Sequence, residues 1–343
     1  MIRAPLGRAA LRCAWIGSAD ADYMNAPIRG SRRIRDINVA MSDITPEAAP
    51  GREHAVLRSM MTVPVVVQRF VDKAPGASAD AICLDLEDSI PPAEKAAARP
   101  LARKAIETMP RSGFALYVRI NGYTTGLTED DLVAVVRPGL DGIVLSKAES
   151  PAMITDLDAH LSRLEREHDI EAGHVAIVPL IETAKGIMEA YDVCRASPRV
   201  TAAIFGAEDF ATDMAIKRTD TAEEVLWARS MVAVACRAAG IAAIDTPDPN
   251  YSTEPHLRRE MTKAKSLGYT GKLCIHPTQV QIANEIFRPA DDEVAEARAI
   301  VEAFERDGLA KGIAAIAVDG KMIDTPIYWR ARRLVEWAEA SNR

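Results

Sequence analysis

Several features that mark common functional classes are missing from this sequence. No apolar run approaches the length of a membrane span, and no Walker or Rossmann pattern of glycines occurs. An excess of positive charge is also missing: the formal net charge is −7, which argues against nucleic-acid binding through bulk electrostatics. We therefore expect a protein that binds neither membranes nor nucleic acid.

Cysteine is scarce, and its spacing does not suggest pairs. The five cysteines are odd in number and scattered, without a C-x-x-C motif. Cys83 and Cys274 lie inside apolar runs, so we expect both to be buried as small hydrophobic residues. Unpaired thiols suit a reducing compartment, and we expect a cytoplasmic location.

The N-terminal part differs in composition from the rest of the chain. Arginine is frequent between Arg3 and Arg35, and acidic residues are few. Such a segment can be an organelle transit peptide. A disordered extension is an alternative, as is a start codon read too early, with Met41 as the true start. We treat residues 1–53 as an N-terminal extension and exclude them from the fold prediction.

From Leu57 onward, short apolar runs alternate with helical patterns. The runs of strand type are 57–63, 81–86, 116–120, 142–145, 176–181, 202–205, 241–244 and 271–275. Continuous apolar strands that alternate with helices indicate a parallel sheet, and eight such units predict a (β/α)8 TIM barrel. We expect the barrel over residues 54–290. A helical C-terminal extension over 291–343 is expected to act as a lid and oligomerisation segment.

Carboxylates stand where two successive strands end. The run 176–181 reaches Glu182, and the run 202–205 passes Gly206 and reaches Glu208 and Asp209. The carboxyl ends of barrel strands form one face, where active sites are built. Mg²⁺ prefers one or two carboxylates together with substrate oxygens and water, so we predict a magnesium site there. Further charged residues at strand ends are Glu87, Asp88, Arg119, Lys147, Asp245 and His276.

An ordered set of motifs carries a resemblance to a known family. It includes Leu84-Asp-Leu-Glu-Asp88, Val118-Arg-Ile-Asn121, Ile181-Glu-Thr183, Phe205-Gly-Ala-Glu-Asp209, Ile275-His-Pro277 and Gly320-Lys-Met-Ile-Asp324. The chain resembles the citrate lyase β-subunit-like CoA-ester lyases, within the aldolase and citrate lyase superfamily. The resemblance extends from about Leu57 to Trp337.

The resemblance implies roles for individual residues. Glu182 and Asp209 match the two Mg²⁺ ligands, and Arg119 matches the arginine that holds the substrate carboxylate. A planar guanidinium can grip a carboxylate with two hydrogen bonds, which lysine cannot do. Asp324 matches a lid aspartate that works in the site of a neighbouring subunit. It is our candidate for acid–base catalysis, with a bound water or Glu87 as alternatives.

Other matches concern the coenzyme A portion of the substrate. Arg69 and Lys73 match basic residues that contact CoA, although a solvated face of an amphipathic helix would also explain them. Leu273, Cys274 and His276 match the strand end that lines the CoA site. The sequence departs from the family where Val65 replaces a glycine, and a valine Cβ hinders close approach of a ligand to the backbone. We therefore expect an altered acyl-CoA entrance.

The implied reaction is the cleavage of a 3-hydroxy-diacid CoA ester, or its formation by condensation. Malyl-CoA, citramalyl-CoA and citryl-CoA are the expected compounds, and a keto acid and acetyl-CoA are the products. The alternatives are a malyl-CoA thioesterase on the same fold and a non-catalytic scaffold subunit. The family implies a homotrimer or hexamer with the lid supplied by a neighbouring subunit.

Overall fold

The computed structural model describes residues 56–111, 113–318 and 320–341. Our expectations for residues 1–53, including the alternative start at Met41, lie outside this described part. Among the helices that are described, none combines the length and the apolar character that crossing a membrane requires.

Within the described residues, eight parallel strands close into a barrel. Each strand pairs with its neighbour in sequence, and β1 pairs with β8 to complete the ring. The strands are β1 (Ser59–Pro64), β2 (Ala81–Asp85), β3 (Ala115–Ile120), β4 (Gly142–Leu145), β5 (Ala176–Ile181), β6 (Ala202–Phe205), β7 (Ala242–Asp245) and β8 (Gly271–Cys274). The predicted (β/α)8 barrel is confirmed, because both its closure and its parallel register are present.

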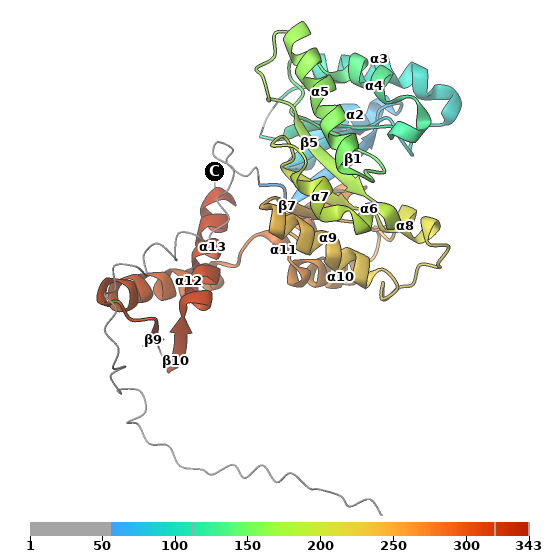
Figure 1. Cartoon of the computed structure of the whole chain (residues 1–343). Coiled ribbons are helices and arrows are strands. Elements are labelled where there is room, and N and C mark those ends of the chain that lie inside the picture. Colours follow the sequence, from blue (N-terminus) through green and yellow to red (C-terminus); the bar gives the residue numbers. More distant parts are fainter. Residues whose placement is uncertain (1–55, 112, 319, 342–343) are drawn as a thin grey trace, which may run out of the picture. The chain divides into compact units, whose positions relative to one another are not determined.

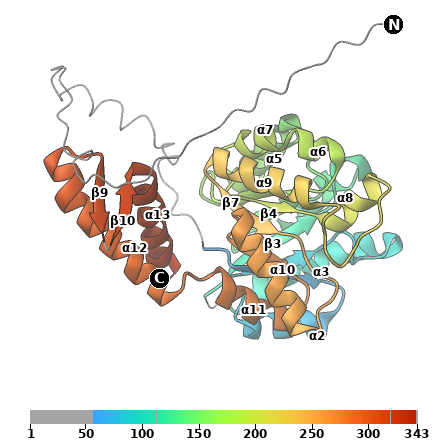
Figure 2. The same cartoon turned by 90° about the horizontal axis from the view of Figure 1, so that it is seen from below.

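Helices connect the strands and lie outside them (Figure 1 and Figure 2). They are α2 (Gln68–Lys73), α3 (Lys95–Thr108), α4 (Thr128–Val135), α5 (Pro151–Glu167), α6 (Ala184–Met188), α7 (Ala190–Arg195), α8 (Ala207–Asp213), α9 (Leu226–Ala239), α10 (Glu254–Leu267) and α11 (Pro277–Phe287). The sequence predicts one helix over 184–196, whereas the structure divides this segment into α6 and α7. Glu189 lies between them with non-helical backbone angles (φ −96°, ψ 4°).

Alternation along each strand sorts the core into two layers. Residues such as Cys83, Tyr117 and Ile204 pack in the barrel interior, while their sequence neighbours pack against the helices. Successive strand residues point to opposite faces. The residues that pack inside the barrel therefore show, by counting in steps of two along each strand, which residue at the strand end also points inward. This parity decides which of the charged strand-end residues reach the mouth of the barrel.

The C-terminal extension contains α12 (Asp291–Ala303), strands β9 (Ala315–Val318) and β10 (Lys321–Asp324), and α13 (Thr325–Ser341). The ring of Phe304 stacks on Tyr328 with centroids 4.9 Å apart, and Ile323 packs with them in a small separate core. The sequence predicts a flexible region around Gly308, Gly312 and Gly320, whereas the structure has helical turns over Phe304–Gly308 and Leu309–Lys311 and an antiparallel pair of strands around Gly320. A positive φ of 76° at Gly320 suits the reversal of the chain before β10.

Candidate active site at the carboxyl ends of the strands

The two predicted metal ligands lie at adjacent strand ends. Glu182 follows β5 and is buried, and Asp209 lies in the first turn of α8, after β6. The backbone N–H of Lys147 donates a hydrogen bond of 2.9 Å to Glu182 Oε1. On the other side, a Cβ added to Gly206 would lie only 2.5 Å from Glu182 Oε2. The side chain of Glu182 is therefore held in a space that glycine leaves open.

Arg119 projects from β3 into the same mouth and is already bound on one edge. Its Nε and Nη2 atoms donate to the two carboxylate oxygens of Asp85, at 2.7 and 2.6 Å. Its Nη1 atom lies 3.1 Å from Glu87 Oε2. The Asp85 carboxylate is fully buried and also accepts hydrogen bonds from the N–H groups of Glu87 and Ser89. Asp85 thus fixes the plane of the guanidinium and leaves its Nη1 edge toward Glu87.

Lys147 joins this arginine cluster to the carboxylate pair. It lies two residues beyond the end of β4, and its ammonium is 3.1 Å from both Glu87 Oε1 and Asp209 Oδ1. Its backbone adopts a positive φ of 52°, which is uncommon for residues other than glycine. The resulting chain of alternating charges runs from Asp85 through Arg119, Glu87 and Lys147 to Asp209.

The electrostatics of the cluster favour a bound cation. Burial raises the pKa of Glu182 to about 8, and the nearby charges of Asp209 and Glu87 act in the same direction. Burial acts to lower the pKa of Lys147, but the surrounding carboxylates outweigh it and raise this pKa. The ionised form of Glu182 is thus disfavoured in the protein alone, even with the ammonium of Lys147 nearby, and a bound cation would stabilise it.

These residues fit a magnesium ion. Among the described residues, no group of three or more His, Cys, Asp or Glu side chains forms a ready metal cage. Mg²⁺ does not require one, because it is usually held by one or two carboxylates and completes its shell with substrate and water. Buried Glu182 and half-buried Asp209 supply such a pair. The space beside Gly206 explains how Glu182 reaches this position.

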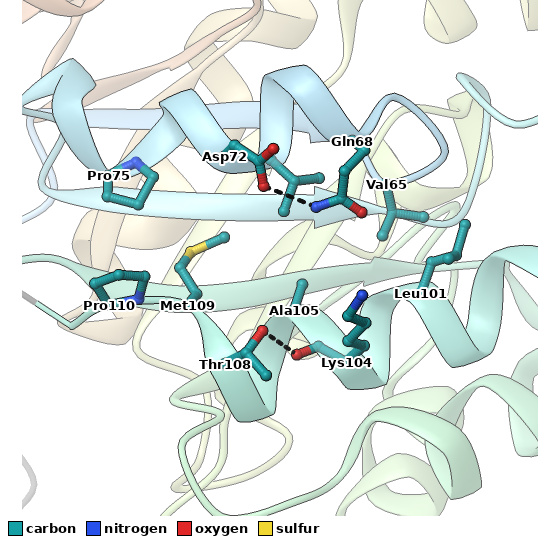
Figure 3. A pocket seen from close by; sticks show the side chains of 11 residues that line it. Val65, Gln68, Asp72, Pro75, Leu101, Lys104, Ala105, Thr108, Met109 and Pro110 are labelled. Atoms are coloured by element: carbon teal, nitrogen blue, oxygen red, sulfur yellow. Dashed lines mark hydrogen bonds between the residues drawn. The ribbon is translucent and has the colours of Figure 1, made fainter.

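The predicted CoA contacts on α2 are exposed basic side chains. Arg69 and Lys73 are both open to solvent, and the Arg69 guanidinium lies 4.9 Å from the ring centre of Phe70. A groove between α2 and α3 (Figure 3) is lined by neither of them. Its polar contacts join Gln68 to Asp72 and Thr108 to the Lys104 backbone. It contains none of the strand-end carboxylates, so we do not regard it as the reaction site.

The predicted residues of β8 fall into two groups. Leu273 packs inside the barrel and Cys274 packs against the helices, and both are buried. Burial raises the pKa of the Cys274 thiol to about 12. His276 is partly exposed, caps α11 by accepting a hydrogen bond from Thr278 N–H, and stacks on Tyr251 at 4.8 Å. Of the three, His276 is the residue with surface available to a ligand.

Asp324 belongs to the C-terminal extension. It ends β10 and accepts a hydrogen bond of 3.2 Å from Ile327 N–H at the start of α13. This hydrogen bond lies within the chain, and the role of Asp324 in the site of a neighbouring subunit stays a prediction.

Asp245 corrects the expectation that all charged strand-end residues face the mouth. Its carboxylate is fully buried and bound by Arg229 of α9, at 2.8 Å for each oxygen, and by Lys272 Nζ at 2.9 Å. Ile244 packs inside the barrel, so the next residue points outward to the helices. Asp85, which the sequence analysis did not single out, has the opposite parity because Cys83 points inward. The sequence carried no signal for either residue, because both strands are apolar on their two faces and only the packing shows which residues point inward.

Comparison with known proteins agrees with this architecture. The sequence pattern of the family described as HpcH/HpaI aldolase/citrate lyase matches residues 58–277. A citrate lyase subunit beta from Leuconostoc mesenteroides subsp. cremoris is 36% identical over 285 residues, which are 83% of this chain and 94% of that protein. An L-malyl-CoA/beta-methylmalyl-CoA lyase from Cereibacter sphaeroides is 34% identical over 288 residues, covering 78% and 90% of the two chains.

A solved structure gives the same picture. The protein CitE from Mycobacterium tuberculosis, in complex with magnesium, acetoacetate and coenzyme A, matches with a TM-score of 0.67. The identity is 26%, and the match covers 84% of this chain and all of that one.

Proposed function

Because the chain belongs to the HpcH/HpaI aldolase/citrate lyase family, we propose that it is a Mg²⁺-dependent carbon–carbon lyase acting on CoA esters. Its substrate would be a 3-hydroxy-diacid CoA ester such as malyl-CoA, citramalyl-CoA or citryl-CoA, which it cleaves to a keto acid and acetyl-CoA or forms by condensation. The observation that carries the proposal is the pairing of Glu182 and Asp209 beside Arg119 at one mouth of the barrel. The lyases and the magnesium-bound structure among its relatives support it.

The residues would divide the work as follows. Glu182 and Asp209 would hold the metal, which when bound supplies Lewis-acid stabilisation of negative charge on oxygen. Arg119 would receive the substrate carboxylate on its Nη1 edge, which Glu87 contacts in the free site. Asp85 keeps the guanidinium in plane through its two hydrogen bonds, so that the arginine binds without losing further side-chain freedom.

Cleavage requires one proton to leave and one to arrive. The hydroxyl proton is removed, the carbon–carbon bond breaks, and its electron pair moves to the carbon next to the thioester. That carbon then takes up a proton to give acetyl-CoA. Asp324 from a neighbouring subunit is the proposed acid–base group, with Glu87 as the alternative within the chain.

The proposal extends to the organisation of the protein. Residues 54–290 would form the catalytic domain, and residues 291–343 would act as a lid and oligomerisation segment in a homotrimer or hexamer. Arg69, Lys73 and His276 would contact the CoA portion, with Leu273 and Cys274 supporting the strand end beneath it. A cytoplasmic location is part of the proposal and is supported by the four described cysteines, which are free and buried.

The decisive experiment is a cleavage assay on malyl-CoA, citramalyl-CoA and citryl-CoA, with the keto acid trapped as its hydrazone. We expect turnover of one of them that EDTA abolishes. Glu182→Ala should lower kcat/KM by at least about 100-fold, because the metal contributes several kcal/mol to the transition state. Glu208→Ala is the matched control, since Glu208 is exposed, lies beside Asp209 in sequence and pairs with Arg218 at 2.9 Å.

Other results would lead to different conclusions. Release of CoA without a keto acid would identify a thioesterase. Absence of turnover on all three esters, with Mg²⁺ still bound, would indicate a different ligand and direct attention to Val65. Equal activity of the Glu182→Ala and wild-type proteins would exclude the metal role of Glu182.

A further inference from the structure

The ammonium of Lys147 lies between two carboxylates at the carboxyl ends of the strands. It is 3.1 Å from Asp209 Oδ1, which the proposed function assigns to the metal, and 3.1 Å from Glu87 Oε1. Its side chain is 34% exposed, and that of Asp209 is 32% exposed. This contact can therefore open toward solvent without disturbing the barrel core.

The backbone of Lys147 has a separate function from its side chain. Its N–H donates to Glu182 Oε1, at 2.9 Å, and its φ of 52° departs from the ordinary strand range. One residue thus contacts three carboxylates: Glu182 through the backbone, and Glu87 and Asp209 through the ammonium. Replacing the side chain removes the charge and keeps the hydrogen bond to Glu182.

Glu87 offers the ammonium a second partner. Its side chain is only 7% exposed, and its other oxygen lies 3.1 Å from Arg119 Nη1. If the contact with Asp209 breaks, Lys147 can remain bound to Glu87. The ammonium of Lys147 therefore keeps Glu87 as a partner while Asp209 binds another ligand.

We propose that the ammonium of Lys147 competes with a divalent metal for Asp209, so that the metal must displace this ammonium in order to bind. The inference rests on the proposed function, because it takes Glu182 and Asp209 as the metal ligands. Lys147 is then a positioning residue: it holds Asp209 and Glu87 in place before the metal arrives, and it lowers the affinity of the free protein for metal.

The test is the affinity of the full chain for Mn²⁺, measured by electron paramagnetic resonance, and for Mg²⁺, measured by calorimetry, both without substrate. Lys147→Met should bind each metal about 2- to 5-fold more tightly than wild type, because the metal no longer competes with a partly exposed ion pair. Lys147→Arg keeps the charge and should stay close to wild type. Lys185→Met removes the same charge from an exposed side chain that lies 3.6 Å from Glu149, and it should also leave the affinity unchanged.

Tighter binding is a result that a merely structural role would not produce, because local damage weakens a metal site. Thermal unfolding gives a second measurement: the rise in Tm on adding Mg²⁺ should be larger for Lys147→Met than for wild type. Lys147→Gln serves as a second neutral variant if the methionine variant folds poorly.

The outcomes separate the inference from the function on which it rests. Unchanged or weaker affinity in both neutral variants, with metal binding intact in wild type and Lys185→Met, would overturn the role of Lys147 alone. A wild-type protein that binds neither Mn²⁺ nor Mg²⁺ would overturn the proposed metal dependence and this inference together.

Discussion

At the scale of single residues, Gly206 controls the position of Glu182. The glycine directly follows β6, and a Cβ at this position would lie 2.5 Å from Glu182 Oε2 and 2.6 Å from its Cβ. Real Cβ atoms do not approach so closely, so one of the two residues would have to move. Glu182 can therefore occupy its buried position at the mouth of the barrel only because residue 206 has no side chain.

We expect Gly206→Ala to displace Glu182 and weaken Mg²⁺ binding by about 10-fold or more, equivalent to about 1.4 kcal/mol. Overpacking should also lower the free energy of unfolding by about 1–3 kcal/mol. Calorimetric titration with Mg²⁺ and urea unfolding would measure the two effects. Gly76→Ala is the matched control, because a Cβ there meets nothing within 4 Å. A Gly206→Ala variant with wild-type Mg²⁺ affinity would refute this role of Gly206.

At the scale of elements, a buried ion network ties β7 and β8 to α9. Asp245 of β7 contacts Lys272 of β8 and Arg229 of α9, and Tyr269 donates a hydrogen bond of 2.7 Å to the Arg229 carbonyl. Burial acts to raise the pKa of Asp245, but the charges of Lys272 and Arg229 outweigh it and lower this pKa. The network therefore stabilises the folded state only while Asp245 is ionised.

This stabilisation should depend on pH in a defined direction. Because the pKa of Asp245 is lower in the folded state than its ordinary value of 3.8, the contribution is complete above that value. It is lost as the pH falls through the folded-state pKa. We expect Asp245→Asn to lower the free energy of unfolding by about 3–5 kcal/mol at pH 7, because it leaves buried Lys272 without a carboxylate partner and Arg229 with only Glu260, 3.2 Å from its Nη1 atom.

Urea unfolding between pH 7 and pH 3 would test both expectations. The variant should lose less stability than wild type in the acidic range, since one ionisable contribution is already missing. Asp220→Asn, at an exposed position, should follow the wild-type curve. A variant that is as stable as wild type at pH 7 would show that the network contributes little.

At the scale of the whole molecule, the outer face of α9 is a candidate interface for the proposed oligomer. Trp227 and Val234 are seven residues apart and so share one face of the helix. Their exposed fractions are 60% and 63%, although the opposite face, with Val232 and Cys236, is fully buried in the core. Large apolar side chains exposed on one helix face can mark a contact with another protein, and we propose that a second copy of the chain covers these two.

The double substitution Trp227→Glu and Val234→Glu should dissociate the assembly, because it places charge in an apolar interface. Light scattering coupled to size-exclusion chromatography would measure the mass. Val133→Glu on α4, where the valine is 43% exposed, is the control and should keep the wild-type mass. A double variant of unchanged mass, or a monomeric wild type, would contradict the interface.

Much of the architecture follows from local pattern. The eight apolar runs became the eight strands, with ends that differ by at most two residues, because each run is short, continuous and bounded by polar or turn residues. Local pattern missed the break at Glu189, where both flanking segments have helical composition. It also missed the strand pair β9 and β10: β9 is a continuous apolar run like those of the barrel, but the glycines on either side of it indicated a flexible region.

The sequence by itself determined the barrel, its order of strands and the presence of Glu182 and Asp209 beyond β5 and β6, because these depend on short-range periodicity and chain order. Only the tertiary structure decided what each strand-end charge contacts. The pairing of β2 with β3 places Asp85 beside Arg119, and the packing of the strand ends brings Lys147 between Glu87 and Asp209. The packing of α9 against β7 brings Arg229 to Asp245. Partners that lie on different elements are brought together by packing, and the sequence of one element does not contain that information.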